Sequence, residues 1–232
     1  MKTTFLYCLF LLLAYSGFSQ EQGVIRVNPL KENEEELTKQ VYKYPSFTNG
    51  IVYFKDNATA EAKMNYNRLS GQILFIGTRG DTLAFAHPET FNKVAIGQDT
   101  FFYYEKGFLE LLTHDPSVNL AKRQTIKYIG QEKSGAYGSY STVTSVNSSN
   151  LYSTDEKMPM KLEIDENSIF KFTNIYYLRD RFGNYFPASK KSFSDLFSHH
   201  EKELKNYLRE HDINFTREKD LLKLIQYMQS LK

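Results

Sequence analysis

The hydrophobic and polar positions follow a two-residue period through the middle of the chain. The clearest run is 60–66, where Ala60, Ala62, Met64 and Tyr66 alternate with charged or amide residues. A strand with this alternation buries one face and exposes the other to solvent. Turn residues interrupt such runs about every eight to twelve positions, a spacing typical of an antiparallel all-β domain. The pattern therefore predicts a β-meander, in which tight turns join neighbouring strands.

Many strand segments can be assigned in this way. A sheet of so many strands is expected to close into a barrel-like shape or to fold into a roll. The predicted strands are residues 50–54, 60–66, 72–76, 82–86, 93–96, 100–104, 108–113, 118–129, 161–164, 169–173 and 175–178.

Apolar residues return at helical spacing over residues 189–232. Ser198 and Glu201 have the spacing of a capping box for a second helix, and Thr216 is placed to cap a third. Each helix has a single apolar stripe, so it must pack on another helix or on the sheet. The sequence thus predicts an α+β protein that is mainly β. We expect an antiparallel β-meander forming a roll or barrel-like sheet, followed by roughly two or three short helices.

Composition and charge exclude several classes of protein. The chain has 232 residues, of which 41% are hydrophobic and 24% are charged, and its formal net charge is +2. This balance lacks the basic surface of a nucleic-acid-binding protein, so no nucleic-acid partner is predicted. No run of about eighteen apolar residues marks a membrane-spanning helix. The single cysteine, Cys8, excludes an intramolecular disulfide and a zinc site of several thiolates.

The N-terminal segment 1–19 has the organisation of a secretory signal peptide. Lys2 precedes an apolar stretch over 5–14, and Gly17 and Ser19 fit the small-residue positions before a cleavage site. Cleavage would remove the only cysteine and leave no transmembrane segment. A chain of this length can bury a sufficient core without disulfides. We therefore expect an exported protein of the periplasm or cell surface of a Gram-negative bacterium.

The mature chain divides by composition into successive regions. Residues 20–45 form an acidic lead-in, residues 46–188 the antiparallel β domain, and residues 189–232 the helical segment. Within the β domain, the stretch 134–154 carries no charged residue and is rich in Ser, Tyr, Thr, Asn and Gly. A long stretch of this kind is typical of a mobile insertion or of a functional loop.

Aromatic side chains supply the candidate contact residues, because the chain has 17 Tyr and 18 Phe but no Trp. In the uncharged loop, Tyr137, Tyr140 and Tyr152 offer rigid rings and hydroxyls for contact with a partner or ligand. Four consecutive rings end at Tyr104, and a strand there must present rings on both faces. Phe102 and Tyr104 form the predicted outward pair, which can cover the helices, line a cavity or contact a partner.

No constellation of residues marks a catalytic or metal site. His199 and His200 are adjacent, and neighbours in sequence point to different sides of a helix, so they cannot share a metal ion. The serine-rich loop has no Gly-x-Ser-x-Gly motif. The sequence therefore predicts no catalytic residue, no bound metal and no cofactor, and it favours a protein that is not an enzyme.

Short motifs span most of the mature chain. In the β region they are Gly50-Ile-Val-Tyr-Phe-Lys-Asp, Asn65-Tyr66-Asn67-x-x-x-Gly71, Gly80-Asp81-Thr82-Leu83 and Val94-x-Ile96-Gly97-x-Asp99-Thr100-Phe101. Further motifs are Gly135-Ala136-Tyr137-Gly138, Lys191-x-Phe193-x-x-x-Phe197 and Asp220-Leu221. Together they resemble a family of uncharacterised exported proteins of Bacteroidetes-type bacteria. The resemblance implies export and brings no catalytic or binding residue with it.

The observations favour an exported, non-enzymatic protein that binds a cell-envelope component or a protein partner. A second hypothesis is a carrier that encloses an apolar small ligand or lipid within the sheet, with Ala60 and Ala62 as small inward positions. A third is a hydrolase that uses the loop 134–154 as a lid.

Overall fold

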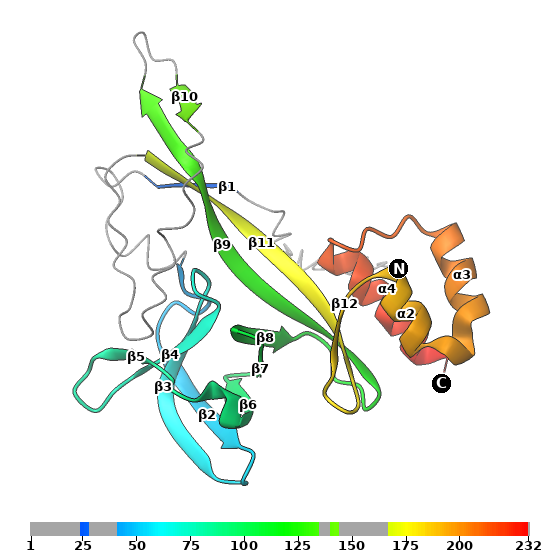
Figure 1. Cartoon of the computed structure of the whole chain (residues 1–232), viewed down its shortest axis with the longest axis horizontal. Helices are drawn as coiled ribbons and strands as arrows, with labels where there is room; N and C mark the ends of the chain where they lie inside the picture. The colour runs from blue at the N-terminus through cyan, green and yellow to red at the C-terminus, as the bar shows by residue number, and fades with distance from the viewer. Residues whose placement is uncertain (1–23, 28–40, 135–139, 144–166, 232) are drawn as a thin grey trace, which may run out of the picture.

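One antiparallel sheet contains every strand that the structure describes (Figure 1). The computed structural model describes residues 24–27, 41–134, 140–143 and 167–231. Along the main path the strands follow the order β1-β11-β9-β8-β7-β6-β2-β3-β4-β5, while β10 pairs with β9 and β12 with β11. The strands are β1 (Val24–Val27), β2 (Thr48–Phe54), β3 (Thr59–Asn67), β4 (Gln72–Ile76), β5 (Thr82–Ala84), β6 (Phe91–Ile96), β7 (Asp99–Tyr104), β8 (Gly107–Leu111), β9 (Val118–Ser134), β10 (Tyr140–Val143), β11 (Asn167–Asp180) and β12 (Tyr185–Pro187).

The predicted meander is confirmed, in two runs. Strands β2 to β5 are neighbours in chain order, and so are β6 to β9. The short 3-10 helix η1 (Pro88–Thr90) leads the chain back, so that β6 pairs with β2 rather than with β5. Two short meanders therefore lie side by side in one sheet.

The sheet curls into a half-barrel because the β3–β4 turn folds back onto β8 and β9. The Gly71 carbonyl accepts a hydrogen bond from the Phe108 amide at 2.8 Å, and the Arg68 carbonyl accepts one from the Ile126 amide at 2.9 Å. Gly71 has a φ of +69°, which favours glycine, and a Cβ on Gly107 would lie 3.0 Å from the Gly71 oxygen. The close approach therefore favours glycine at 107, and the backbone conformation favours glycine at 71.

Strands β9 and β11 form a long arm that extends beyond the curled sheet (Figure 1). Their register runs from Asn167 opposite Glu132 to Asp180 opposite Val118. The separate strands predicted over 169–173 and 175–178 are one strand. Asn174 lies within this strand, and its side-chain oxygen accepts a hydrogen bond from the side-chain amide of Gln124, the residue opposite.

The predicted C-terminal helices are confirmed as α2 (Lys190–Leu196), α3 (Glu201–Glu210) and α4 (Glu218–Ser230), with the 3-10 turn η4 (Ser198–His200) between the first two. Their apolar faces pack together and against one end of the arm. We call the result the helix core. Its buried residues are Val118, Leu120, Tyr176, Leu178, Phe193, Phe197, Leu204, Leu221, Leu224, Ile225 and Met228.

A second core fills the hollow of the curled sheet, and we call it the curled-sheet core. Large side chains occupy it, with the Tyr66 and Phe101 rings stacked at 5.6 Å. Its buried residues are Val52, Met64, Tyr66, Ile73, Phe91, Val94, Ile96, Phe101 and Phe108.

The predicted helix caps are wrong. Ser198 belongs to η4, and α3 begins at Glu201 without a side-chain cap. The Thr216 hydroxyl donates to Asn214 rather than accepting from the first turn of α4. The observed side-chain cap is Ser189, whose hydroxyl accepts from the Ser192 amide at 3.2 Å.

Several sequence predictions meet the described residues only in part. Strand β1 lies within the predicted acidic lead-in and pairs with β11, and β10 lies within the uncharged stretch and pairs with the end of β9. The predicted signal peptide 1–19 and the predicted strand 161–164 lie outside the described residues. Of the helices in the described ranges, none is both long and apolar enough to cross a membrane.

Candidate binding surface

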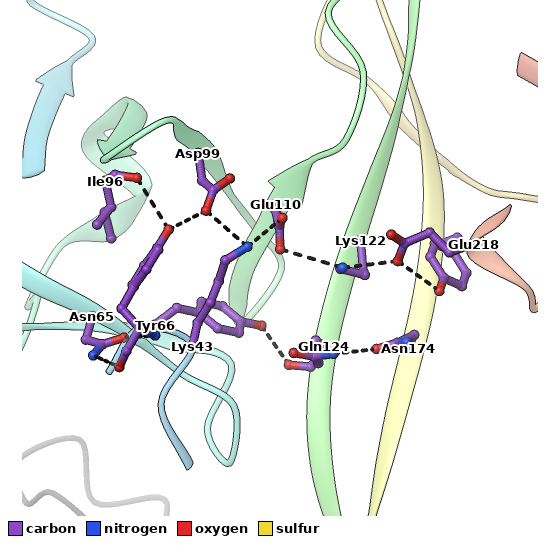
Figure 2. Close-up of polar contacts among 12 residues, drawn as sticks. Lys43, Asn65, Tyr66, Ile96, Asp99, Glu110, Lys122, Gln124, Asn174 and Glu218 are labelled. Carbon is purple, nitrogen blue, oxygen red and sulfur yellow. Dashed lines mark hydrogen bonds and ion pairs between the residues drawn. The ribbon is translucent and has the colours of Figure 1, made fainter. Parts of the chain in front are cut away.

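Two polar clusters lie on opposite faces of the arm. The first is on the inner face, which is continuous with both cores, and it is a row of alternating charges (Figure 2). Lys43 lies 3.2 Å from Asp99 and 2.5 Å from Glu110. Lys122 lies 3.8 Å from Glu110 and 3.1 Å from Glu218 on α4. We call these five residues the ion-pair chain, and they connect the curled sheet to the helices.

Tyrosine hydroxyls extend the ion-pair chain into each core. Tyr44 donates to the Asp99 carboxylate at 2.7 Å, and Tyr176 donates to Glu218 at 3.3 Å. Burial, with the neighbouring carboxylates, raises the pKa of both phenols. The network therefore holds these tyrosines neutral and uses each as a donor.

The ion-pair chain is built as a structural connection. Lys43, Glu110 and Lys122 are 18, 15 and 11% exposed, and each lies within 4 Å of an opposite charge. A buried charge that is paired in this way has no remaining need for a ligand. The charged groups of the ion-pair chain are therefore used in joining the two cores.

The second cluster lies on the opposite, outer face of the arm. Two of the aromatic rings of β7 point toward this face. Phe101 is fully buried in the curled-sheet core and Tyr103 packs against that core. Phe102 and Tyr104 point the other way, as the alternation predicts. Both remain partly exposed. Strand alternation has therefore set this outward pair apart from the core.

The outward rings meet aromatic residues of the arm and of β12. The Tyr104 ring centroid lies 5.6 Å from that of Tyr177 and 4.6 Å from that of Tyr185. Tyr177 and Arg179 share a face of β11, and Arg179 lies opposite Tyr185, so these three side chains lie on one surface.

Two guanidinium groups complete this surface. Arg179 lies over the Phe102 ring at 4.2 Å and 5.9 Å from the Tyr185 centroid. Arg123 lies 6.0 Å from the Tyr104 centroid and 5.9 Å from that of Tyr177. We call these six residues the arginine–aromatic cluster: Phe102, Tyr104, Arg123, Tyr177, Arg179 and Tyr185.

Several donors of this cluster lack an acceptor within the described chain. The Nε atoms of Arg123 and Arg179 are buried without a hydrogen-bond partner, and the proton of the buried Tyr185 hydroxyl has no acceptor. Burial raises the pKa of Tyr185 to about 12, against the opposing effects of the Arg179 charge and of a side-chain hydrogen bond from Arg179. The hydroxyl therefore stays protonated. A buried donor without an acceptor costs free energy, so this surface differs from the satisfied ion-pair chain.

The sequence-predicted contact residues are placed unequally. Phe102 and Tyr104 lie together in the arginine–aromatic cluster. Tyr140 is the first residue of β10, opposite Ser134. Tyr137 and Tyr152 lie outside the described residues.

Sequence reasoning missed Tyr177, Arg179, Tyr185 and Arg123. Tyr177 and Arg179 are two positions apart, and this spacing by itself indicates that they share a face of one strand. The strand order β12-β11-β9-β8-β7, which brings these residues onto one surface, could not be predicted from the sequence.

The described residues hold no group of three or more His, Cys, Asp and Glu side chains that could bind a metal ion. His199 is exposed in η4, and the His211 ring stacks on Tyr207 at the end of α3.

Comparisons with protein families, curated proteins and solved structures gave no match to this chain.

Proposed function

We propose that this protein is an exported, non-enzymatic binding protein of the bacterial envelope, and that it holds a protein partner on the arginine–aromatic cluster. The observation that carries this proposal is the Arg179 guanidinium, which stacks on Phe102 at 4.2 Å and makes no ion pair within the described chain. Export is supported by the N-terminal sequence pattern alone.

The composition of the cluster supports a protein partner. Tyrosine and arginine are enriched among the residues that dominate protein–protein binding energy. Ile175, on the same face of β11 as Tyr177, is 41% exposed and adds apolar area beside the rings. Rings already packed on one another lose little side-chain entropy on binding.

The carrier and hydrolase hypotheses draw no comparable support. The hollow of the curled sheet is occupied by large buried side chains, and Ala60 lies at its exposed end. The hydrolase lid was predicted over residues that lie mostly outside the described ranges.

The test is site-specific photo-crosslinking of the full chain in its own host. A crosslinking amino acid replaces Tyr104 in one variant and Tyr53, on β2 outside the cluster, in the control. We expect a discrete crosslinked protein from position 104 that is absent from position 53. Equal products from both positions, or none from 104, would overturn the proposed function.

A further inference from the structure

We infer that the arginine–aromatic cluster is a carboxylate-binding site that takes an extended acidic segment of the protein partner, with Arg179 as its main anchor. This inference rests on the proposed function and specifies the chemistry of the partner.

The charge and planar shape of the guanidinium groups define the ligand that the cluster can take. Arg179 and Arg123 each keep a buried Nε–H without an acceptor, and the Tyr185 hydroxyl adds a further donor. Guanidinium groups bind carboxylates through paired N–H bonds, which are among the strongest hydrogen bonds in proteins. The complementary ligand is therefore an anion with planar acceptor geometry.

Carboxylates of the chain itself do not fill this role. Glu105 approaches Arg123 only to 4.0 Å and is 61% exposed. The Asp180 carboxylate accepts hydrogen bonds from the amides of Phe182 and Asn184 and from the Asn184 side chain, each at 2.8 Å. Asp180 is thus committed to its own turn. The cluster keeps a positive charge for a partner.

Ring contacts fix the guanidinium groups in advance. The Arg179 guanidinium is stacked on Phe102, and the Arg123 guanidinium donates to the Tyr104 carbonyl. Stacked arginine pays less entropy when it binds a carboxylate than a free side chain would. This preorganisation makes Arg179, which has no ion pair of its own, the stronger anchor.

The spacing of the two arginines along the strands matches that of an extended segment. Arg123 lies opposite Ile175, which is four residues before Arg179 on β11. At about 3.3 Å per residue, the two arginine backbones are about 13 Å apart. An extended peptide with acidic residues four positions apart has the same spacing. Tyr177 lies between the two arginine positions, where it can contact the middle residue of such a peptide.

A binding assay on the full exported chain tests the inference. The probe is a fluorescein-labelled peptide Glu-Thr-Val-Thr-Glu, and the control peptide carries Gln in place of both Glu. Binding is followed by fluorescence anisotropy at low and at physiological ionic strength. We expect Arg179→Gln to weaken binding about tenfold, as for a hydrogen-bonded charge at a hot spot. We expect the charge-matched control Arg79→Gln, in the exposed β4–β5 turn, to leave it unchanged.

A second variant protects the test against misfolding. Arg179→Lys keeps the charge but loses the planar fork, so we expect binding between that of the wild type and that of Arg179→Gln. Equal binding of the Glu and Gln peptides would overturn the inference, as would a peptide affinity that neither Arg179 variant changes. Full competition by inorganic phosphate, or Arg179-dependent binding of phosphatidylglycerol vesicles without peptide binding, would also overturn it.

The two proposals fail separately. If crosslinking at position 104 captures a protein but Arg179→Gln leaves peptide affinity intact, the binding function stands and the acidic segment is wrong. If the peptide binds through Arg179 but crosslinking captures nothing, the carboxylate site stands and the partner-binding function is wrong.

Discussion

The two faces of the arm carry the same residue types, cationic and tyrosine side chains, but in different hydrogen-bonding environments. On the inner face, Lys122 is held between Glu110 and Glu218, and the Tyr66 hydroxyl donates to the Gln124 carbonyl at 2.9 Å. On the outer face, the Arg179 Nε has no acceptor, and the proton of the Tyr185 hydroxyl has none either. The cations of the ion-pair chain and the Tyr66 phenol have acceptors, whereas the Arg179 Nε and the Tyr185 hydroxyl have none.

This difference separates structure from binding. A fully partnered network stabilises the arrangement that makes it and offers nothing to a ligand. An unpartnered donor costs stability in the free protein and recovers that cost when an acceptor arrives. We therefore expect substitutions on the inner face to lower stability, and matched substitutions on the outer face to leave stability unchanged or raised.

The largest effect is expected from Lys122→Met. This change removes the cation that lies between Glu110 and Glu218; Glu110 keeps Lys43, whereas Glu218 loses its ion pair. Breaking a largely buried pair by removing one partner costs about 3 kcal/mol. The measurement is the free energy of unfolding in urea, extrapolated to zero denaturant.

The exposed pair Lys205–Glu201 on α3 is the matched control for Lys122. Its separation of 2.7 Å is shorter than either contact of Lys122, but both side chains are more than half exposed. Exposed helix pairs contribute only about 0.3–0.5 kcal/mol. If Lys205→Met costs as much as Lys122→Met, burial is not what gives the ion-pair chain its value.

A smaller loss is expected from Tyr66→Phe. The substitution keeps the ring stacked on Phe101 and removes only the buried hydroxyl that donates to the Gln124 carbonyl. The carbonyl loses this donor, at a cost of about 1–2 kcal/mol. Urea unfolding measures the loss. An unchanged free energy of unfolding would show that the curled sheet is not fastened to the arm at this point.

The sequence predicted the strands more fully than it predicted either face of the arm. Alternation along one strand is a local property, so the outward direction of Phe102 and Tyr104 could be read directly. The partners of those rings depend on the strand order and register from β7 through β8 and β9 to β11 and β12. Nothing local specifies that register.

The ion-pair chain shows the same limit. Lys43, Glu110 and Glu218 come from distant parts of the chain, and each by itself reads as an ordinary surface charge. Their meeting follows from the curl of the sheet and the docking of α4. The wrong caps at Ser198 and Thr216 have a local cause, because a 3-10 turn and an Asn214 side chain replaced the expected geometry.

The alkaline pH dependence of stability separates the contribution of Tyr185. Burial raises the pKa of Tyr185 to about 12, whereas an unfolded tyrosine has a pKa near 10. The unfolded state therefore loses its proton first. The contribution of this group is complete below about pH 10 and is lost as the pH rises toward about 12.

Between pH 9 and pH 11, we expect the free energy of unfolding of the wild type to fall by about 1 kcal/mol more than that of Tyr185→Phe. This value allows for the partial exposure of the side chain. Other buried tyrosines titrate identically in both proteins and cancel in the difference. The measurement is urea unfolding at each pH. Parallel curves for the two proteins would mean that Tyr185 titrates normally.

The smallest effect has the most informative sign. At neutral pH, Tyr185→Phe removes a buried hydroxyl whose proton has no acceptor, while the ring can keep its contact with Tyr104. Removing an unsatisfied polar group is expected to raise the free energy of unfolding by about 0.5–1 kcal/mol. The same substitution at Tyr66 is expected to lower it. Since the two changes delete the same atom, opposite signs would trace the difference to the presence or absence of an acceptor. A loss at both positions would mean that the Tyr185 hydroxyl finds an acceptor in solution, and the outer face would then be as self-sufficient as the inner one.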